Sequence, residues 1–290
     1  MNFAKLHGAG NDFLLFDGRD HPELERSLGA LAPSLCDRRL GVGADGVLLV
    51  LPAGTGVARL LYWNSDGSPA AFCANGTRCA ARFVAERWGW REPIVETGHA
   101  AVPAEVRGVE VTLRLPAPEA VHPWGELDVD GAAVRCRYLV VGVPHLVVPV
   151  DWPDFRERPL APLAPALRRH VALPPVGANV TFVQRSPDGA LAVRSFERGV
   201  EAETLSCGSG VVAAGLVAVA EGWSAAPAAL LTASGRTLVV APEGVPPSCP
   251  SRLVGPAERI CEGDLSPEFL LSVPGPRSPV PGRSGGPTSS

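Results

Sequence analysis

The chain has 290 residues, of which 46% are hydrophobic and 19% are charged, and its formal net charge is −4 at pH 7. This composition is typical of a globular protein, and without a basic excess it argues against nucleic acid and anionic membranes as partners. Because the first residues lack an apolar signal core and no apolar run approaches the ~20 residues of a membrane helix, we expect a cytoplasmic protein.

Short apolar segments bounded by Gly, Pro, Asn or Asp predict strands along the first part of the chain. Apolar residues at helical spacing predict helices over residues 24–39 and 76–88. A Pro-containing run at 115–118 predicts the place where the chain passes from its first part to its second part. The strands of this first part are predicted at residues 13–16, 47–51, 60–63, 94–96, 101–106 and 109–115.

The second part repeats this order, with helices predicted over residues 165–170 and 208–221. A further strand over residues 252–264 is predicted to return to the first part. From residue 273 on, Pro, Gly, Ser and Arg leave too little apolar surface to fold. The strands of the second part are predicted at residues 138–143, 146–150, 180–184, 191–196, 230–233 and 237–241.

An offset of 134 residues, the separation of Cys73 and Cys207, brings distant segments into register. The aligned pairs are 8–11 with 142–145, 42–45 with 176–179, and 62–64 with 196–198. Because one offset joins four separate places, we predict two copies of one fold. The first half comprises residues 1–117 and 255–271, the second half comprises residues 118–254, and residues 272–290 form a disordered tail.

Cys73 and Cys207 each open a short Gly-containing turn that runs into an apolar helix. Inverting the α-carbon of an amino acid requires a base on one face and an acid on the other. A thiol suits both roles because its ordinary pKa is near 8.5, and a helix N-terminus lowers that pKa while its free N–H groups bind carboxylates. The pair therefore predicts a racemase or epimerase, and inert core cysteines are the alternative.

Polar residues gather at predicted strand ends around the same turns. Glu197 and Arg198 are suited to hold an ammonium and a carboxylate, with a surface ion pair as the alternative. His145, the repeat partner of Asn11, is either a proton acceptor for a thiol or a structural histidine. Four asparagines are candidate substrate contacts or plain turn residues: Asn11, Asn64, Asn75 and Asn179.

The cysteine and lysine content argues against a metal or a cofactor. Seven cysteines without a secretion signal do not predict a disulfide framework, and Cys73 and Cys79 lack a usual zinc spacing. A pyridoxal enzyme needs a lysine for its Schiff base, and the only lysine is Lys5, near the start of an N-terminal strand. We therefore expect catalysis without metal or cofactor.

These motifs, in this order, resemble the diaminopimelate epimerase family over nearly the whole chain that is predicted to fold. Several separate stretches carry the resemblance, so it is far more specific than one short pattern. They are residues 5–13, 41–46, 64–68, 73–79, 142–145, 179, 197–199, 203–204, 207–210 and 255–257.

The resemblance implies an α+β fold of two pseudo-symmetric halves, each a small barrel-like sheet around a central helix, with the active site in the cleft between them. It implies interconversion of LL- and meso-2,6-diaminopimelate in lysine and peptidoglycan-precursor biosynthesis. Cys73 and Cys207 would be the acid/base thiols, tuned by His145 and Glu197, and a homodimer is one option for assembly. The implied substrate contacts are Asn11, Asn64, Ala74, Asn75, Gly76, Asn179, Glu197, Arg198, Gly208 and Ser209.

Three positions depart from the usual family pattern. Val143 stands where the family often has a substrate-contacting Asn, and Gly46 stands where many members have Gln. Ala74 replaces the usual Gly after the first catalytic cysteine, and its methyl is expected to crowd the carboxylate site. These departures bear on substrate range, chiefly at the distal end of the substrate.

Two other functions stay open. A proline or hydroxyproline racemase shares the implied fold, but the stretches 64–67 and 197–199 argue against it. A non-catalytic dithiol sensor would join Cys73 and Cys207 in a reversible disulfide.

Overall fold

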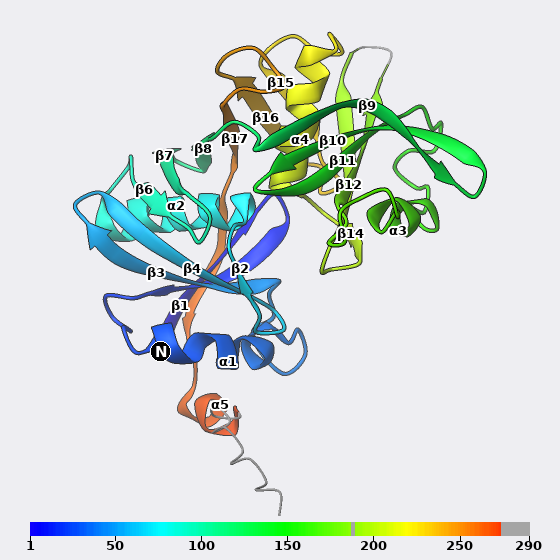
Figure 1. The fold of residues 1–290 in the computed structure, drawn as a ribbon. Coiled ribbons are helices and arrows are strands. Elements are labelled where there is room, and N and C mark those ends of the chain that lie inside the picture. The colour runs from blue at the N-terminus through cyan, green and yellow to red at the C-terminus, as the bar shows by residue number, and fades with distance from the viewer. Residues whose placement is uncertain (187–188, 274–290) are drawn as a thin grey trace, which may run out of the picture.

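A computed structural model describes residues 1–186 and 189–273 of the chain (Figure 1). The predicted tail, residues 272–290, therefore lies outside the described residues from residue 274 on. Within the described part, no helix combines the length and the apolar character needed to cross a bilayer.

The first part of the chain is a sheet wrapped along one central helix. Strand β2 forms an antiparallel hairpin with β1 and runs parallel to β3, and β4 runs parallel to β6. The elements are β1 (Asn2–Gly8), β2 (Asn11–Asp17), α1 (Leu24–Cys36), β3 (Gly46–Gly54), β4 (Val57–Asn64), β5 (Pro69–Ala70), α2 (Ala74–Trp88), β6 (Ile94–Glu96), β7 (Ala101–Arg107) and β8 (Glu110–Leu115).

The second part repeats this pattern strand for strand. Its β11 is antiparallel to β10 and parallel to β12, and β13 is parallel to β15. The elements are β9 (Ala120–Val129), β10 (Ala132–Val141), β11 (Val143–Val150), α3 (Leu163–Arg168), β12 (Asn179–Arg185), β13 (Leu191–Glu197), β14 (Ala202–Thr204), α4 (Gly208–Ala220), β15 (Ala228–Leu231), β16 (Thr237–Pro242) and β17 (Ser251–Pro256).

The two parts exchange strands where the chain passes between them. Strand β9 follows β8 in sequence but pairs with β10, whereas β18 (Glu258–Asp264) follows β17 but pairs with β1. Strands β8 and β17 pair with each other, so that hydrogen bonds join the two parts directly. Figure 1 shows the resulting two lobes, with the orange segment that contains β18 running from one lobe down the other toward α5 (Pro267–Ser272).

Helices α2 and α4 occupy equivalent central positions. Helix α2 packs against β1, β2, β7 and β8, and α4 packs against β10, β11, β15 and β16. Helix α4 is buried almost all round because its sequence is apolar on every face, as expected for a helix enclosed by sheet. The first turns of both helices are buried as well, which places their N-terminal N–H groups inside the molecule.

The observed elements differ from the predicted ones at a few boundaries. The helix predicted over residues 24–39 ends at Cys36, because the Asp37 side chain accepts hydrogen bonds from the Arg39 and Leu40 N–H groups and forms a turn. The single strand predicted over residues 252–264 is two strands, which separate at Ala257. The strand predicted over residues 138–143 is interrupted at Gly142, whose φ of 69° marks a tight turn. Strand β9 was not predicted.

Candidate active site

The first cysteine caps the N-terminus of α2. The Cys73 backbone is extended, and its sulfur accepts a hydrogen bond from the Gly76 N–H at 3.4 Å. Gly8 lets the start of α2 lie directly on β1, because a Cβ at Gly8 would be 2.8 Å from the Asn75 carbonyl oxygen. Burial raises the pKa of Cys73 to about 11, although the Gly76 N–H and the Arg78 guanidinium each act to lower it. The lowering expected from the helix start is therefore present but outweighed by burial.

The second cysteine occupies the same position at the start of α4. Cys207 is 4% exposed, and its sulfur lies 3.7 Å from the Ser209 hydroxyl. Only glycine fits at residue 210, because a Cβ there would be 2.5 Å from the Thr181 hydroxyl and 3.3 Å from the Cys207 sulfur. Burial, and then the charge of Glu197, raise the pKa of Cys207 well above its ordinary value.

The two helix starts meet between the cysteines. A Cβ on Gly208 would lie 2.7 Å from the Ala74 methyl, so these two repeat-equivalent residues face each other. The Asn75 side chain joins the two loops, because its Nδ2 donates to the Ser206 carbonyl at 2.8 Å and its Oδ1 accepts from Arg78 at 2.7 Å. Both thiols therefore flank one junction. The Ala74 methyl is 3% exposed and lies against Gly208.

Glu197 reaches the second cysteine from the end of β13. Its carboxylate accepts a hydrogen bond from the Thr204 hydroxyl, and the Cys207 thiol is close enough to act on its pKa. Burial raises the pKa of Glu197 although the Thr204 hydroxyl and the Cys207 thiol both act to lower it. A carboxylate with a raised pKa beside a thiol is a suitable proton acceptor for that thiol.

His145 lies behind the same cysteine and is fully buried. Its Nε2 is 3.0 Å from the Ser209 hydroxyl, which in turn contacts the Cys207 sulfur. Burial, followed by the charge of Arg198, lowers the pKa of His145 to about 3. The imidazole is therefore neutral at physiological pH, and it is linked to Cys207 through the Ser209 hydroxyl.

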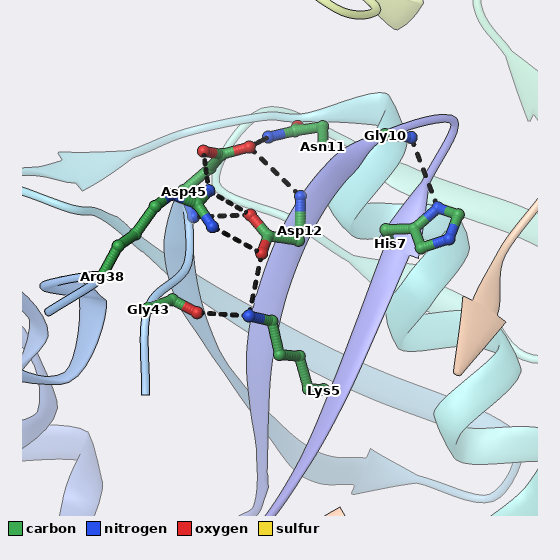
Figure 2. Close-up of polar contacts among 8 residues, drawn as sticks. All are labelled: Lys5, His7, Gly10, Asn11, Asp12, Arg38, Gly43 and Asp45. Carbon is green, nitrogen blue, oxygen red and sulfur yellow. Dashed lines mark hydrogen bonds and ion pairs between the residues drawn. The ribbon is translucent and has the colours of Figure 1, made fainter. Parts of the chain in front are cut away.

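Asn11, the repeat partner of His145, contacts the first cysteine. Its Oδ1 lies 3.7 Å from the Cys73 sulfur and 3.4 Å from the Asn75 Nδ2. Its own Nδ2 donates to Asp45 at 2.8 Å, and Asp45 also forms an ion pair with Arg38 (Figure 2).

The other predicted contacts lie at strand ends near these loops. Asn179 begins β12 beside His145, and its Oδ1 accepts from the Arg198 N–H at 2.8 Å. The described hydrogen bond of Asn64, at the end of β4, is to Ser68 in its own loop. Arg198 follows Glu197 directly and is partly buried.

Tyr62 fills the space around Gly46, one of the positions that departs from the family pattern. A Cβ on Gly46 would be 2.6 Å from the Tyr62 ring and 2.7 Å from the Trp63 carbonyl oxygen. Tyr62 also lines a small cavity of about 10 Å³ beside Cys73. The wall of this cavity is mostly apolar and consists of Leu48, Leu60, Tyr62, Ala70, Ala71, Phe72, Cys73, Gly76 and Thr97.

Four residues that contact the predicted site were not singled out from the sequence. Asp45 holds Asn11, Thr204 holds Glu197, Ser206 anchors Asn75, and Arg78 crosses the base of α2. The offset of 134 residues carried a signal for Asp45, because it aligns with the predicted contact Asn179. Arg78 is fully buried, yet in the sequence it occupies an ordinary position within an amphipathic helix.

Comparisons with known proteins place this site in a family. The model of the family described as diaminopimelate epimerase matches residues 3–111 and 137–243. A protein of Aquifex aeolicus named diaminopimelate epimerase is 37% identical over 283 residues, which cover 93% of this chain and 99% of the relative. One of Gemmatimonas aurantiaca with the same name is 36% identical over 245 residues, which cover 83% of this chain and 87% of the relative.

Solved structures with much lower identity share the fold. A phenazine biosynthesis protein of the PhzF family from Bacillus anthracis has a TM-score of 0.70 at 15% identity, covering 92% of this chain and 99% of that one. A hydroxyproline epimerase from Agrobacterium vitis has a TM-score of 0.65 at 18% identity, covering 91% of each chain. These likenesses establish a mixed α/β fold shared by proteins of different names. The family model and the relatives above 35% identity are more specific, and they show that the chain belongs to the diaminopimelate epimerase family and has the isomerase activity for which that family is named.

Proposed function

We propose that Cys73 and Cys207 interconvert LL- and meso-2,6-diaminopimelate without a cofactor. The observation that carries this proposal is the meeting of α2 and α4, where two repeat-equivalent cysteines begin two helices whose first residues are in contact. One cysteine, as thiolate, takes the α-proton from one face of the substrate. The other, as thiol, gives a proton to the opposite face, and the roles exchange in the reverse direction.

The α-carboxylate of the substrate binds at the two helix starts. Free N–H groups and the positive end of the helix dipole favour an anion there, and the small residues place little side-chain bulk beside the backbone. Closure around the substrate excludes water, which strengthens these interactions as the anionic intermediate forms. The N–H groups in question belong to Ala74, Asn75, Gly208 and Ser209, and the Gly76 N–H would have to exchange its bond to the Cys73 sulfur for the carboxylate.

Glu197 and His145 set the protonation state of Cys207. Glu197 receives the thiol proton, because its carboxylate lies within reach and its pKa is raised by burial. The neutral imidazole of His145 orients the Ser209 hydroxyl that contacts the sulfur. Without a route for its proton, a thiol as buried as Cys207 would stay protonated.

The rest of the substrate lies toward the strand ends. Arg198 forms a forked pair with the distal carboxylate, and Glu197 holds an ammonium group. This placement of Arg198 is supported by the Asn179 side chain, which accepts a hydrogen bond from the Arg198 N–H. Asn64 is the repeat partner of Arg198 and is a candidate for the opposite side of the pocket. Asn11 and Asn75 complete the pocket on the side of Cys73.

The finer architecture is also part of the proposal. Because β17 runs on into β18 and these strands pair with β8 and β1, each half is proposed to close into a barrel-like sheet around its central helix. The halves are residues 1–117 with 255–271, and 118–254, with the substrate in the cleft between them. We place the enzyme in the cytoplasm, with a homodimer as the assembly to test and without nucleic acid or membrane partners.

The proposal is tested by hydrogen exchange at the α-carbon. In heavy water with no added cofactor, the protein should catalyse incorporation of deuterium at the α-carbon of LL-diaminopimelate and convert this substrate to the meso isomer. Cys73→Ala and Cys207→Ala should each abolish turnover, whereas Cys261→Ala is a matched control on the exposed strand β18. Full turnover in either active-site variant would refute the two-thiol mechanism. Exchange of proline but not diaminopimelate would instead identify a proline-type racemase.

A further inference from the structure

The Asn11 side chain is held between a carboxylate and the first thiol. Its Nδ2 donates to Asp45 Oδ2 at 2.8 Å (Figure 2). Its Oδ1 faces the Cys73 sulfur at 3.7 Å. A carboxylate accepts hydrogen bonds and donates none, so Asp45 fixes which end of the Asn11 amide points toward it. The amide oxygen is thereby turned toward Cys73.

Asp45 is itself held in place by a charged network. Arg38 bridges Asp45 and Asp12 with hydrogen bonds of 2.8 and 2.7 Å, and the Asp12 N–H donates to Asp45 Oδ2 at 3.2 Å. Lys5 pairs with Asp12 at 3.1 Å and donates to the Gly43 carbonyl (Figure 2). Turning the Asn11 amide over would place its oxygen against this anchored carboxylate, which is unfavourable.

The amide orientation has a consequence for the proton on Cys73. An amide oxygen accepts a hydrogen bond from a thiol but repels a thiolate, so the contact favours the protonated form. At Cys207 the neighbouring acceptor is the Glu197 carboxylate, which is able to take the proton away. The two repeat-equivalent thiols therefore have different proton acceptors.

We propose that Asp45 is a positioning residue that locks the Asn11 amide with its oxygen toward Cys73, so that the substrate-free enzyme holds Cys73 as the proton-donating thiol. This inference rests on the proposed two-thiol function for its meaning in catalysis. Other groups also act on Cys73: the Gly76 and Asn75 N–H groups and Arg78 favour the thiolate, and Glu197 disfavours it. The Tyr62 hydroxyl from β4 also interacts with Cys73.

The test measures the pKa of the Cys73 thiol directly by its rate of alkylation with iodoacetamide as a function of pH. Trypsin cleaves after Arg78, so the fragment of residues 60–78 contains Cys73 alone and mass spectrometry separates it from Cys79. In Asp45→Asn, the amide at residue 45 accommodates either orientation of the Asn11 amide, and the long 3.4 Å hydrogen bond from Asn75 Nδ2 is then the contact that still favours the oxygen toward Cys73. The thiol pKa should then fall by about one unit, with a roughly threefold faster alkylation at a pH below both pKa values, because the larger thiolate fraction is partly offset by its lower nucleophilicity.

Asp45→Asn also removes a charge, and a double-mutant cycle with Asn11→Ala separates the two effects. If Asp45 acts through the Asn11 amide, Asp45→Asn should shift the Cys73 pKa clearly less in the Asn11→Ala background, where only the charge effect remains. Equal shifts in both backgrounds would mean a charge effect alone and would overturn the proposal, as would no shift in either. Asp45→Ala provides a second variant with the same expected result if Asp45→Asn does not fold.

The alkylation measurements need no substrate, so a negative result for Asp45 can be distinguished from a negative result for the proposed epimerase function. If Cys73→Ala retained full epimerase turnover, the two-thiol mechanism would fall whatever the cycle showed. If the cysteine variants are inactive but the cycle shows no role for Asn11, only the positioning role of Asp45 is overturned.

Discussion

Exchanging the residues at 74 and 208 tests whether the two halves meet about a pseudo-twofold axis. A methyl on Gly208 would lie 2.7 Å from the Ala74 methyl and 3.2 Å from the Asn75 Oδ1. There is thus room for one methyl at the junction but not for two. Gly208→Ala alone should therefore lower the free energy of unfolding by about 1–3 kcal/mol, the usual cost of overpacking a core.

The reverse change should be mild, and the two together should compensate. Ala74→Gly removes one buried methyl, at about 0.8 kcal/mol, and adds helix-glycine entropy of roughly 0.5–1 kcal/mol. In the double variant the methyl moves to the opposite helix start. Because one Ala and one Gly remain in the two first turns, its stability should lie within about 1 kcal/mol of the wild type.

Urea unfolding of the wild type, both single variants and the double variant measures the coupling between the two positions. The deuterium-exchange assay run alongside shows whether the junction still supports catalysis. If the two single effects simply added in the double variant, the methyl groups would not share one space. That result would refute the facing arrangement of Ala74 and Gly208.

Three further changes probe the site. Glu197→Gln should lower turnover by about 10²–10⁴-fold with a smaller change in KM, because Gln cannot take the Cys207 proton, and steady-state kinetics check this. His145 has a folded pKa of about 3 against about 6.5 when unfolded. The contribution of the neutral imidazole to the free energy of unfolding is therefore complete above about pH 6.5, and it is lost as pH falls toward 3, by up to about 1.36 kcal/mol per pH unit. Urea unfolding at several pH values should show this dependence in the wild type, and His145→Gln should remove it. Asn75→Ala should cost about 2–3 kcal/mol in unfolding measurements by leaving Arg78 and the Ser206 carbonyl without their partner. Asn75→Asp should keep the Arg78 contact but lose the bonds to Ser206 and Asn11, whose oxygens would then face a carboxylate oxygen.

The sequence was most informative where local pattern and repeat agreed. The helix predicted to start at Gly208 does so, and the offset correctly made α2 and α4 equivalent, because caps and apolar spacing are local properties. Strand β9 was not predicted because Pro123 and Gly125 interrupt its alternation and most of its residues are at least partly exposed. It is a strand because it pairs with β10, a contact that no local signal contains.

The pKa directions and the connecting contacts depended on tertiary structure. The helix start was expected to lower the cysteine pKa values, and its N–H groups do so, but burial of Cys73 and Cys207 has the larger effect. Burial of a loop between two lobes cannot be read from its own residues. The same holds for Thr204 and Ser206, whose roles arise only because β14 and the loop before α4 lie beside Glu197 and Asn75.

The two repeats have the same residue at the positions of Cys73 and Cys207 but different residues at the neighbouring positions, and this pattern suits an epimerase. Inverting one carbon centre requires similar acid/base groups on opposite faces, which is the role proposed for the equivalent Cys73 and Cys207. The distal centre of diaminopimelate, however, does not change during the reaction and needs a pocket on one side only. The neighbouring repeat positions have accordingly diverged in charge and hydrogen bonding: Asn11 aligns with His145, Asp45 with Asn179, and Asn64 with Arg198. If both halves had kept identical surroundings, the two thiols would have equal proton acceptors and the pocket would lack a distinct distal end.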